Sequence, residues 1–141
     1  KQQKLSFIFA VSDQIKELPR MNARSAANLA QFTAALIVAK LVPFTVIKAL
    51  DMGGKLNRNE ALFLQMMLEQ YFSSVEIEDA YQQFLVLYMK PQYQAMRASL
   101  AMYIMKHFQR YILKAKNLAP EKAEGLKRKA AAALNALNGT S

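Results

Sequence analysis

The feature that most constrains this chain is the helical spacing of its apolar residues. In the segment 23–40, Leu29, Phe32 and Leu36 recur on one side of a helix, and the same period returns in later segments. No Val-, Ile- or Thr-rich segment alternates apolar and polar residues over six positions, so strand signals are weak. Alanine, leucine, methionine and lysine are common, and these residues favour helices. The pattern predicts an all-α fold.

Helix-breaking residues divide this pattern into about seven helices. Pro19 ends the first, Pro43 suits the first turn of a short third helix, and Pro120 opens the last. The expected helices are 4–18, 23–40, a short one within 41–51, 58–72, one ending before residue 91, 94–115 and one beginning at residue 120. Short links make successive helices antiparallel neighbours, which predicts a helical repeat of the HEAT or armadillo kind. No clear repeat period is present, so an irregular bundle is the alternative.

Two capping boxes mark the starts of the fourth and fifth helices. Asn57 precedes Glu60 by three residues, and Ser73 precedes Glu76 by the same interval. In this motif the first side chain bonds a backbone N–H of the opening turn, and the acidic side chain bonds the N–H of the capping residue. We therefore expect each pair to begin a helix.

The most apolar stretch, residues 36–50, is not a membrane span. Lys40, Pro43 and Lys48 interrupt it, whereas a spanning helix needs about 18 or more apolar residues with few or no charges. We expect this stretch to be scaffold, a short helix between two longer ones, and we expect no membrane partner.

The residue inventory argues against an enzyme. The chain has one histidine, His107, and no cysteine, which excludes thiol catalysis and cysteine-ligated zinc. No glycine-rich phosphate loop follows a strand, and no serine has the context of a nucleophile. We expect no catalytic residue, no metal and no cofactor, with His107 a structural residue at the edge of an inner helix face. An all-helical enzyme or small-ligand binder with a polar pocket near His107 is the alternative from another functional class.

The formal charge of +9 is unevenly distributed along the chain. Residues 1–89 carry nine Lys or Arg and eight Asp or Glu, a net of +1, whereas residues 90–141 carry ten and two, a net of +8. Such asymmetry favours a polyanionic partner for the C-terminal third. A solvated lysine face without a partner is the alternative.

Basic residues in this third are candidates for contact with RNA phosphates. Three of them are spaced by four on one predicted helix and share a face. The RNA-contact candidates are Lys106, Arg110, Lys114, Lys122, Lys127, Arg128 and Lys129. Tyr103, Phe108 and Tyr111 are expected to look inward, so base stacking is not expected and any RNA contact is sequence-independent.

The stretch "NLAQFTAALIVAKLVPFTVIKALD", residues 28–51, resembles the MA-three helical domain of relatives of translation initiation factor four G. Two flanking stretches, "FIFAVSDQIKELP" and "MRASLAMYIMKHFQRYILKAKNLAPEKAEGLKRKAAAALNAL", resemble the C-terminal region of the nucleolar suppressor-of-glycerol-defect family. The resemblance covers most of the chain, and it rests on the order and spacing of helical patterns. It implies that residues 1–115 are the later part of an MA-three-type domain and that 116–141 are a basic helical extension packed on it.

The resemblance also implies a function. Members of that family have an initiation-factor-four-G-like middle domain upstream and act in the nucleolus as assembly factors of the small ribosomal subunit, in pre-rRNA processing. The implied partners are a DEAD-box RNA helicase of the initiation-factor-four-A class, other pre-ribosome assembly factors and pre-rRNA. An MA-three scaffold of a translation or splicing complex is the alternative.

Two further expectations concern surfaces. Helices of a complete MA-three domain would precede Lys1, so part of the apolar segment 7–11 is expected to lie exposed or under another chain. The candidates for protein contact are polar residues of the expected helix 23–40 and of the rest of the MA-three-like stretch: Arg24, Asn28, Lys48 and Asp51.

Overall fold

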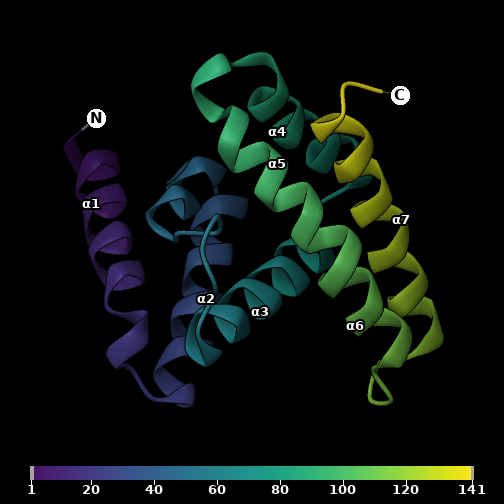
Figure 1. Ribbon diagram of the computed structural model, residues 1–141, viewed down its shortest axis with the longest axis horizontal. Coiled ribbons are helices and arrows are strands. Elements are labelled where there is room, and N and C mark those ends of the chain that lie inside the picture. Colours follow the sequence, from purple (N-terminus) through teal and green to yellow (C-terminus); the bar gives the residue numbers. More distant parts are fainter. Residues whose placement is uncertain (1, 141) are drawn as a thin grey trace. The chain divides into compact units, whose positions relative to one another are not determined.

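Figure 1 shows the computed structural model, which describes residues 2–140; all its regular elements are helical. The seven α-helices are α1 (Gln2–Lys16), α2 (Ala23–Val38), α3 (Arg58–Ser74), α4 (Ile77–Met89), α5 (Gln94–Tyr103), α6 (Gln109–Lys114) and α7 (Pro120–Leu137). Four shorter elements connect them: the 3₁₀ helices η1 (Leu18–Arg20), η2 (Phe44–Ala49) and η3 (Pro91–Tyr93), and the π-helical turn η4 (Ile104–Phe108). The predicted all-α class is confirmed for these residues.

The chain forms two compact units that divide between Tyr71 and Phe72, within α3. This division does not coincide with the boundary expected after residue 115. The reason is the apolar seam of α7, which includes the buried side chains Leu126, Ala130 and Ala133. Small residues let a neighbouring backbone approach closely, and α7 packs most extensively along α4. The basic C-terminal segment is therefore an integral helix of the second unit.

The first unit is organised around η2, the short helix of the apolar stretch. Phe44, Val46 and Ile47 are buried, and α1 packs on η2. Pro43 is the extended residue that precedes η2, one position earlier than expected, with φ −76° and ψ 156°. The side-chain amide of Asn59 donates to the carbonyl oxygens of Leu18, at 3.0 Å, and of Met21, which ties the start of α3 to η1.

The start of α1 leaves apolar surface exposed, as expected for part of the segment 7–11. Phe9 is 66% exposed and Phe7 is also exposed, whereas Val11 is buried. Among residues 2–140, no helix combines the length and apolar character needed to cross a bilayer.

One of the two expected capping boxes is present. The Asn57 backbone N–H donates to Glu60 Oε1 at 2.9 Å, and the Glu60 backbone N–H donates to Asn57 Oδ1 at 2.8 Å. The expected box at Ser73 and Glu76 is wrong. Ser73 belongs to the last turn of α3, and Glu76 precedes α4 without a side-chain capping bond. The Lys129 ammonium donates to the Phe72 carbonyl oxygen at 2.7 Å, which supports a helical last turn in α3.

A lysine occupies the left-handed position that ends α2. Lys40 has φ 61°, and its N–H donates to the Ile37 carbonyl oxygen at 3.0 Å, while the Leu41 N–H donates to the Leu36 carbonyl oxygen at 2.9 Å. This pair of bonds is the Schellman motif, which favours glycine at the left-handed residue. The helix expected to reach Lys40 therefore ends at Val38.

We predict that Lys40→Gly stabilises the protein by about 0.5–1 kcal/mol. A residue with a Cβ in the left-handed conformation costs about 1–2 kcal/mol, which glycine avoids. Glycine also loses more chain entropy on folding, which offsets about 0.5–1 kcal/mol of that stabilisation. Urea denaturation checks the difference. Lys40→Ala retains a Cβ and is expected to give no gain, so equal stabilisation by both variants would contradict the explanation.

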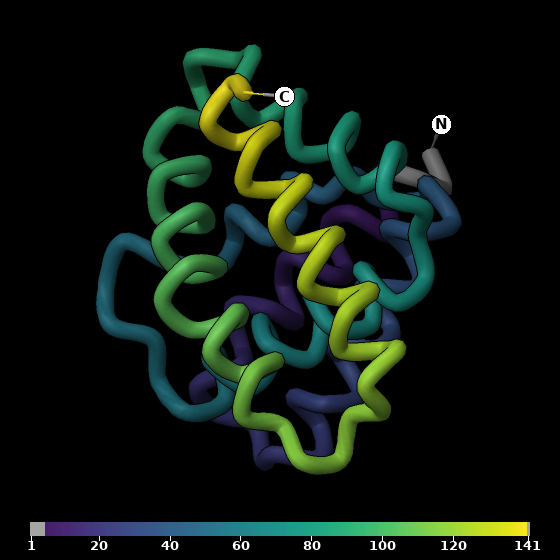
Figure 2. Tube along the Cα trace, turned by 90° about the vertical axis from the view of Figure 1, so that its right-hand side faces the viewer, coloured from purple at the N-terminus to yellow at the C-terminus, as the bar shows by residue number. Residues whose placement is uncertain are grey.

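In the second unit, α5, η4 and α6 form one continuous helix, the one expected over 94–115 (Figure 1). Its buried residues recur strictly every fourth position: Leu100, Ile104, Phe108 and Ile112. In a regular α-helix a spacing of four drifts around the axis by about 40° per step, because there are 3.6 residues per turn. The wider π-helical turn at η4 reduces this drift and keeps the four side chains facing inward. Figure 2 shows α7 running alongside this helix.

Candidate nucleic-acid interface

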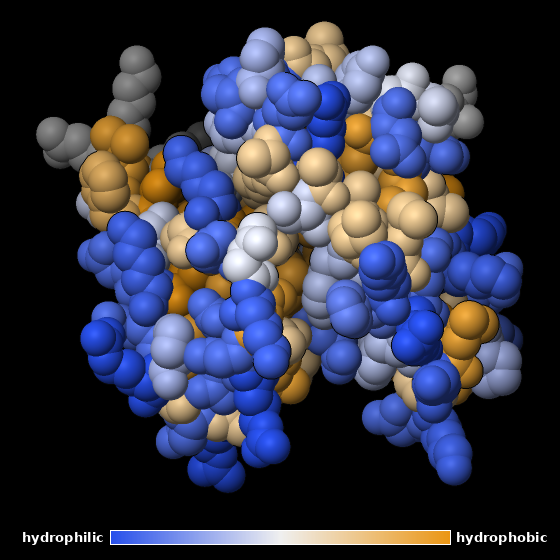
Figure 3. All heavy atoms as spheres, in the orientation of Figure 1, coloured by the Kyte–Doolittle hydropathy of each residue, from blue (hydrophilic) through white to orange (hydrophobic). Residues whose placement is uncertain are grey.

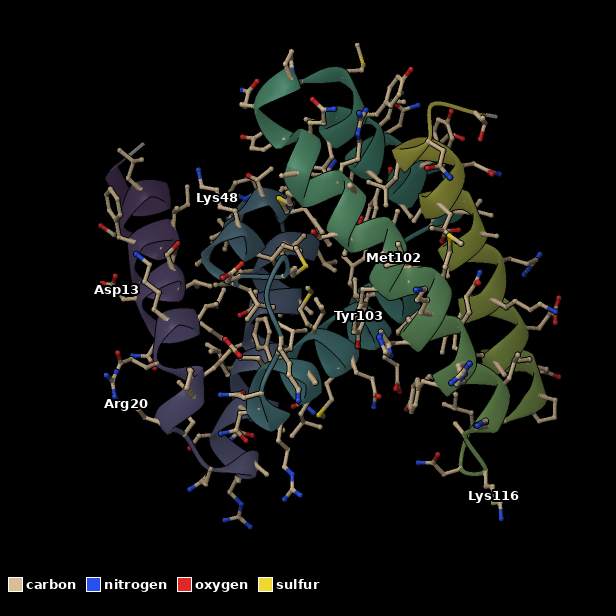
Figure 4. All side chains as sticks on the ribbon, viewed as in Figure 1. Asp13, Arg20, Lys48, Met102, Tyr103 and Lys116 are labelled. Carbon is tan, nitrogen blue, oxygen red and sulfur yellow. The ribbon has the colours of Figure 1, made fainter. Side chains whose placement is uncertain are left out.

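The continuous α5–α6 helix presents a line of three basic side chains to solvent, as expected. Lys106, Arg110 and Lys114 are all exposed, and we call them the basic row. They lie roughly half a turn around the helix from the buried Ile104 and Phe108, whose packing fixes the direction of the row. Figure 4 shows that Met102 and Tyr103 lie near the middle of this helix, where α5 ends, and that Lys116 lies just beyond its α6 end.

The helix α7 contributes further exposed basic side chains. Lys122, Lys127 and Arg128 are exposed, and the short loop from α6 to α7 adds the exposed Lys116. Lys116 was not among the candidates, although its place in the run "LKAKN" is a visible signal. Figure 3 shows hydrophilic side chains gathered over the ends of α6 and α7 that this loop joins.

Lys129 does not belong to this surface, which corrects its inclusion among the RNA-contact candidates. Its side chain is half-buried, and its ammonium is bound to the Phe72 carbonyl oxygen near the end of α3. Helix positions two residues apart in sequence point about 200° apart around the axis, so Lys127 and Lys129 lie on opposite sides of α7. A cation at a helix C-terminus also interacts favourably with the helix dipole. Lys129 therefore has a structural role.

We predict that Lys129→Ala lowers the free energy of unfolding by about 1.5–3 kcal/mol, the usual contribution of a hydrogen bond to a charged group. Lys127→Ala, two residues away and exposed, is the matched control and should change stability by less than about 0.5 kcal/mol. Thermal and urea denaturation of both variants measure this. Equal stability of the two variants would show that the Phe72 contact contributes nothing.

Rings line a second side of the same helix. His107 is exposed and Tyr103 and Tyr111 are half-buried, whereas Phe108 is buried. The Tyr103 and His107 ring centroids are 5.5 Å apart with an interplanar angle of 36°. The expectation that the aromatic residues look inward thus holds fully for Phe108 and only in part for the two tyrosines. Burial raises the pKa of the Tyr103 hydroxyl well above its usual range, so this ring stays neutral.

His107 is more exposed than expected for a structural residue at the edge of an inner face. Its ring stacks obliquely on Tyr103, which gives it a packing contact within the helix. Among residues 2–140, no group of three or more His, Cys, Asp or Glu side chains could hold a metal ion.

The candidates for protein contact all lie at the surface of the first unit. Arg24 and Asn28 are exposed one turn apart on α2, and Lys48 on η2 is exposed as well (Figure 4). Asp51 is exposed just after η2, and its carboxylate folds back over the following glycines: a Cβ added at Gly54 would lie 3.3 Å from Asp51 Oδ2. Three of these residues come from α2 and η2, and Asp51 lies in the loop that follows η2.

Comparison with known proteins gives this surface no precedent. No family model, no curated protein and no solved structure matches the chain. The interpretation of the surface therefore rests on its own geometry and charge.

Proposed function

We propose that this chain is a non-enzymatic scaffold of early small-subunit ribosome assembly that binds RNA phosphates through its second unit. The observation that carries the proposal is the exposed basic row of α5–α6, in a segment whose net charge is +8. Six exposed candidates remain once Lys129 is set aside: Lys106, Arg110, Lys114, Lys122, Lys127 and Arg128.

The composition of this segment favours a polyanion over plain solvation. Protein surfaces that only need to be soluble usually carry both signs of charge interspersed. Residues 90–141 instead carry ten basic and two acidic side chains, and both acids, Glu121 and Glu124, lie on α7. The basic row itself therefore has no acidic residue on its own helix. Lysine and arginine held on a rigid helix can contact phosphates without reading base sequence.

The resemblance to the nucleolar suppressor-of-glycerol-defect family supplies the cellular setting of the proposal. In that setting the fold is an MA-three-type helical repeat, the location is the nucleolus, and the RNA is pre-rRNA. The protein works with a DEAD-box helicase of the initiation-factor-four-A class and with other pre-ribosome assembly factors. Arg24, Asn28, Lys48 and Asp51 are the proposed protein contacts, and their exposure on the first unit is compatible with that role.

Affinity purification from cells tests the setting. The tagged protein should recover small-subunit pre-rRNA, pre-ribosome assembly factors and a DEAD-box helicase. A variant with the basic row changed to glutamate should lose the RNA and retain the protein partners. Recovery of translation or splicing complexes in place of pre-rRNA would contradict the setting and favour the alternative MA-three scaffold.

A further inference from the structure

Two parallel rows of side chains run along the α5–α6 helix. One is the basic row, Lys106, Arg110 and Lys114, and the other, which we call the ring row, is Tyr103, His107 and Tyr111. Each row has a spacing of four residues. His107 directly follows Lys106, and Tyr111 directly follows Arg110, so the rows lie about a quarter turn apart. Phosphate-binding charges and flat rings are thus offered side by side on one rigid element.

The π-helical turn η4 holds the first residue of the basic row and the middle residue of the ring row. It spans Ile104–Phe108 and therefore contains both Lys106 and His107. Because its turn is wider than that of an α-helix, residues four apart lie more nearly in line along the axis. The 5.5 Å between the Tyr103 and His107 rings reflects this alignment. Turns of this kind occur frequently at functional sites in α-helices.

The spacing of the rings decides which form of RNA fits. Residues four apart on a helix are separated by about 6 Å along the axis, whereas bases stacked in a duplex follow one another at about 3.4 Å. In an A-form duplex the bases are paired inside, and the major groove is too deep and narrow for side chains to read. An unpaired strand can spread its bases to match a wider spacing, and a basic track beside aromatic side chains is the usual arrangement of single-strand binding sites.

We propose that the RNA held by α5–α6 is single-stranded, with phosphates on the basic row and unpaired bases stacked against the ring row at His107. This inference rests on the proposed function, since it names the class of RNA that the same surface takes. It also replaces the expectation that bases make no stacking contact here. His107 is the exposed ring of the row and so the one that a base reaches directly, with the Tyr103 ring behind it.

Binding to a short oligouridylate and to a duplex of the same length tests the inference with the whole 141-residue chain. The wild type should prefer the single strand. His107→Ala should weaken single-strand binding about five- to hundredfold, the usual effect of removing one stacking ring. His107→Phe keeps a ring and loses any charge, so it should restore affinity. Met105→Ala is the matched control, because Met105 is 55% exposed and points to the other side of the helix.

The outcomes separate this inference from the proposed function. If the duplex binds as tightly as the single strand and His107→Ala has no effect, the inference is wrong while RNA binding by the basic row stands. A loss in Met105→Ala that equals the loss in His107→Ala would also overturn the ring row as the stacking site. If neither RNA binds at low salt, the proposed function fails as well.

Discussion

Changing Lys106, Arg110 and Lys114 together to glutamate is expected to weaken RNA binding at least about a thousandfold at low salt. Each phosphate contact releases condensed counterions, which contributes about tenfold in affinity near 50 mM salt. The variant removes three such contacts and places three carboxylates where phosphates would lie. All three side chains are exposed, so the substitutions should leave the fold intact, which circular dichroism can verify.

A matched charge reversal on the first unit is the control for this prediction. Arg24, Lys48 and Lys55 are also exposed, and changing them to glutamate lowers the formal net charge from +9 to +3, as the basic-row variant does. The control should retain most of the affinity, because it leaves the proposed phosphate contacts intact and salt screens exposed charges that make no direct contact. Equal losses in the two variants would mean that net charge alone drives binding and that the basic row is not the site.

Gly139→Ala is expected to lower the free energy of unfolding by about 1–2 kcal/mol. Gly139 has φ +72° and ends α7 in a Schellman motif: its N–H donates to the Ala136 carbonyl oxygen at 3.1 Å, and the Thr140 N–H donates to that of Asn135 at 2.7 Å. An alanine there costs about 1–2 kcal/mol for the left-handed backbone, and the loss of glycine's extra chain entropy offsets about 0.5–1 kcal/mol of this. Its Cβ would also lie 2.3 Å from Tyr88 Cζ, so the tyrosine ring must swing away.

The displacement of Tyr88 adds to that cost. The Arg97 guanidinium lies 5.0 Å from the Tyr88 ring centroid, and such a contact is worth about 0.5–1 kcal/mol at an exposed site. Gly125→Ala is the matched control within α7, because nothing lies within 4 Å of the Cβ it adds and the backbone there is helical. It should stabilise by about 0.5–1 kcal/mol. Urea denaturation measures both, and two changes of the same sign would contradict the account.

Local patterns in the sequence predicted some features whose interacting residues are close along the chain, although not the left-handed end of α2 at Lys40. The capping box at Asn57 and Glu60 could be predicted because both bonds join residues three apart. The end of α7 at Asn138 and Gly139 also depends on bonds between residues three and five apart. The similar spacing at Ser73 and Glu76 gave a wrong capping box. There the last turn of α3 is stabilised by a hydrogen bond from Lys129, which lies far along the chain.

Contacts between distant residues account for what the sequence left out. The bond from Lys129 to the Phe72 carbonyl joins residues 57 apart, so no local spacing rule could predict it. The spacing of four between Leu100, Ile104, Phe108 and Ile112 is a visible signal of the π-helical turn. A helical wheel alone, however, does not distinguish an apolar stripe that winds around a regular α-helix from a straight stripe on a helix with a widened turn.

The salt dependence of RNA binding tests the central claim, that the second unit binds RNA through its phosphates, most directly. Six contacts to a single strand predict a slope of about −4 in a plot of log affinity against log salt, so a rise from about 50 to 200 mM should weaken binding about 300-fold. The basic-row variant, with three contacts left, should give a slope of about −2. A flat plot for the wild type, or the same slope for the variant, would contradict the claim.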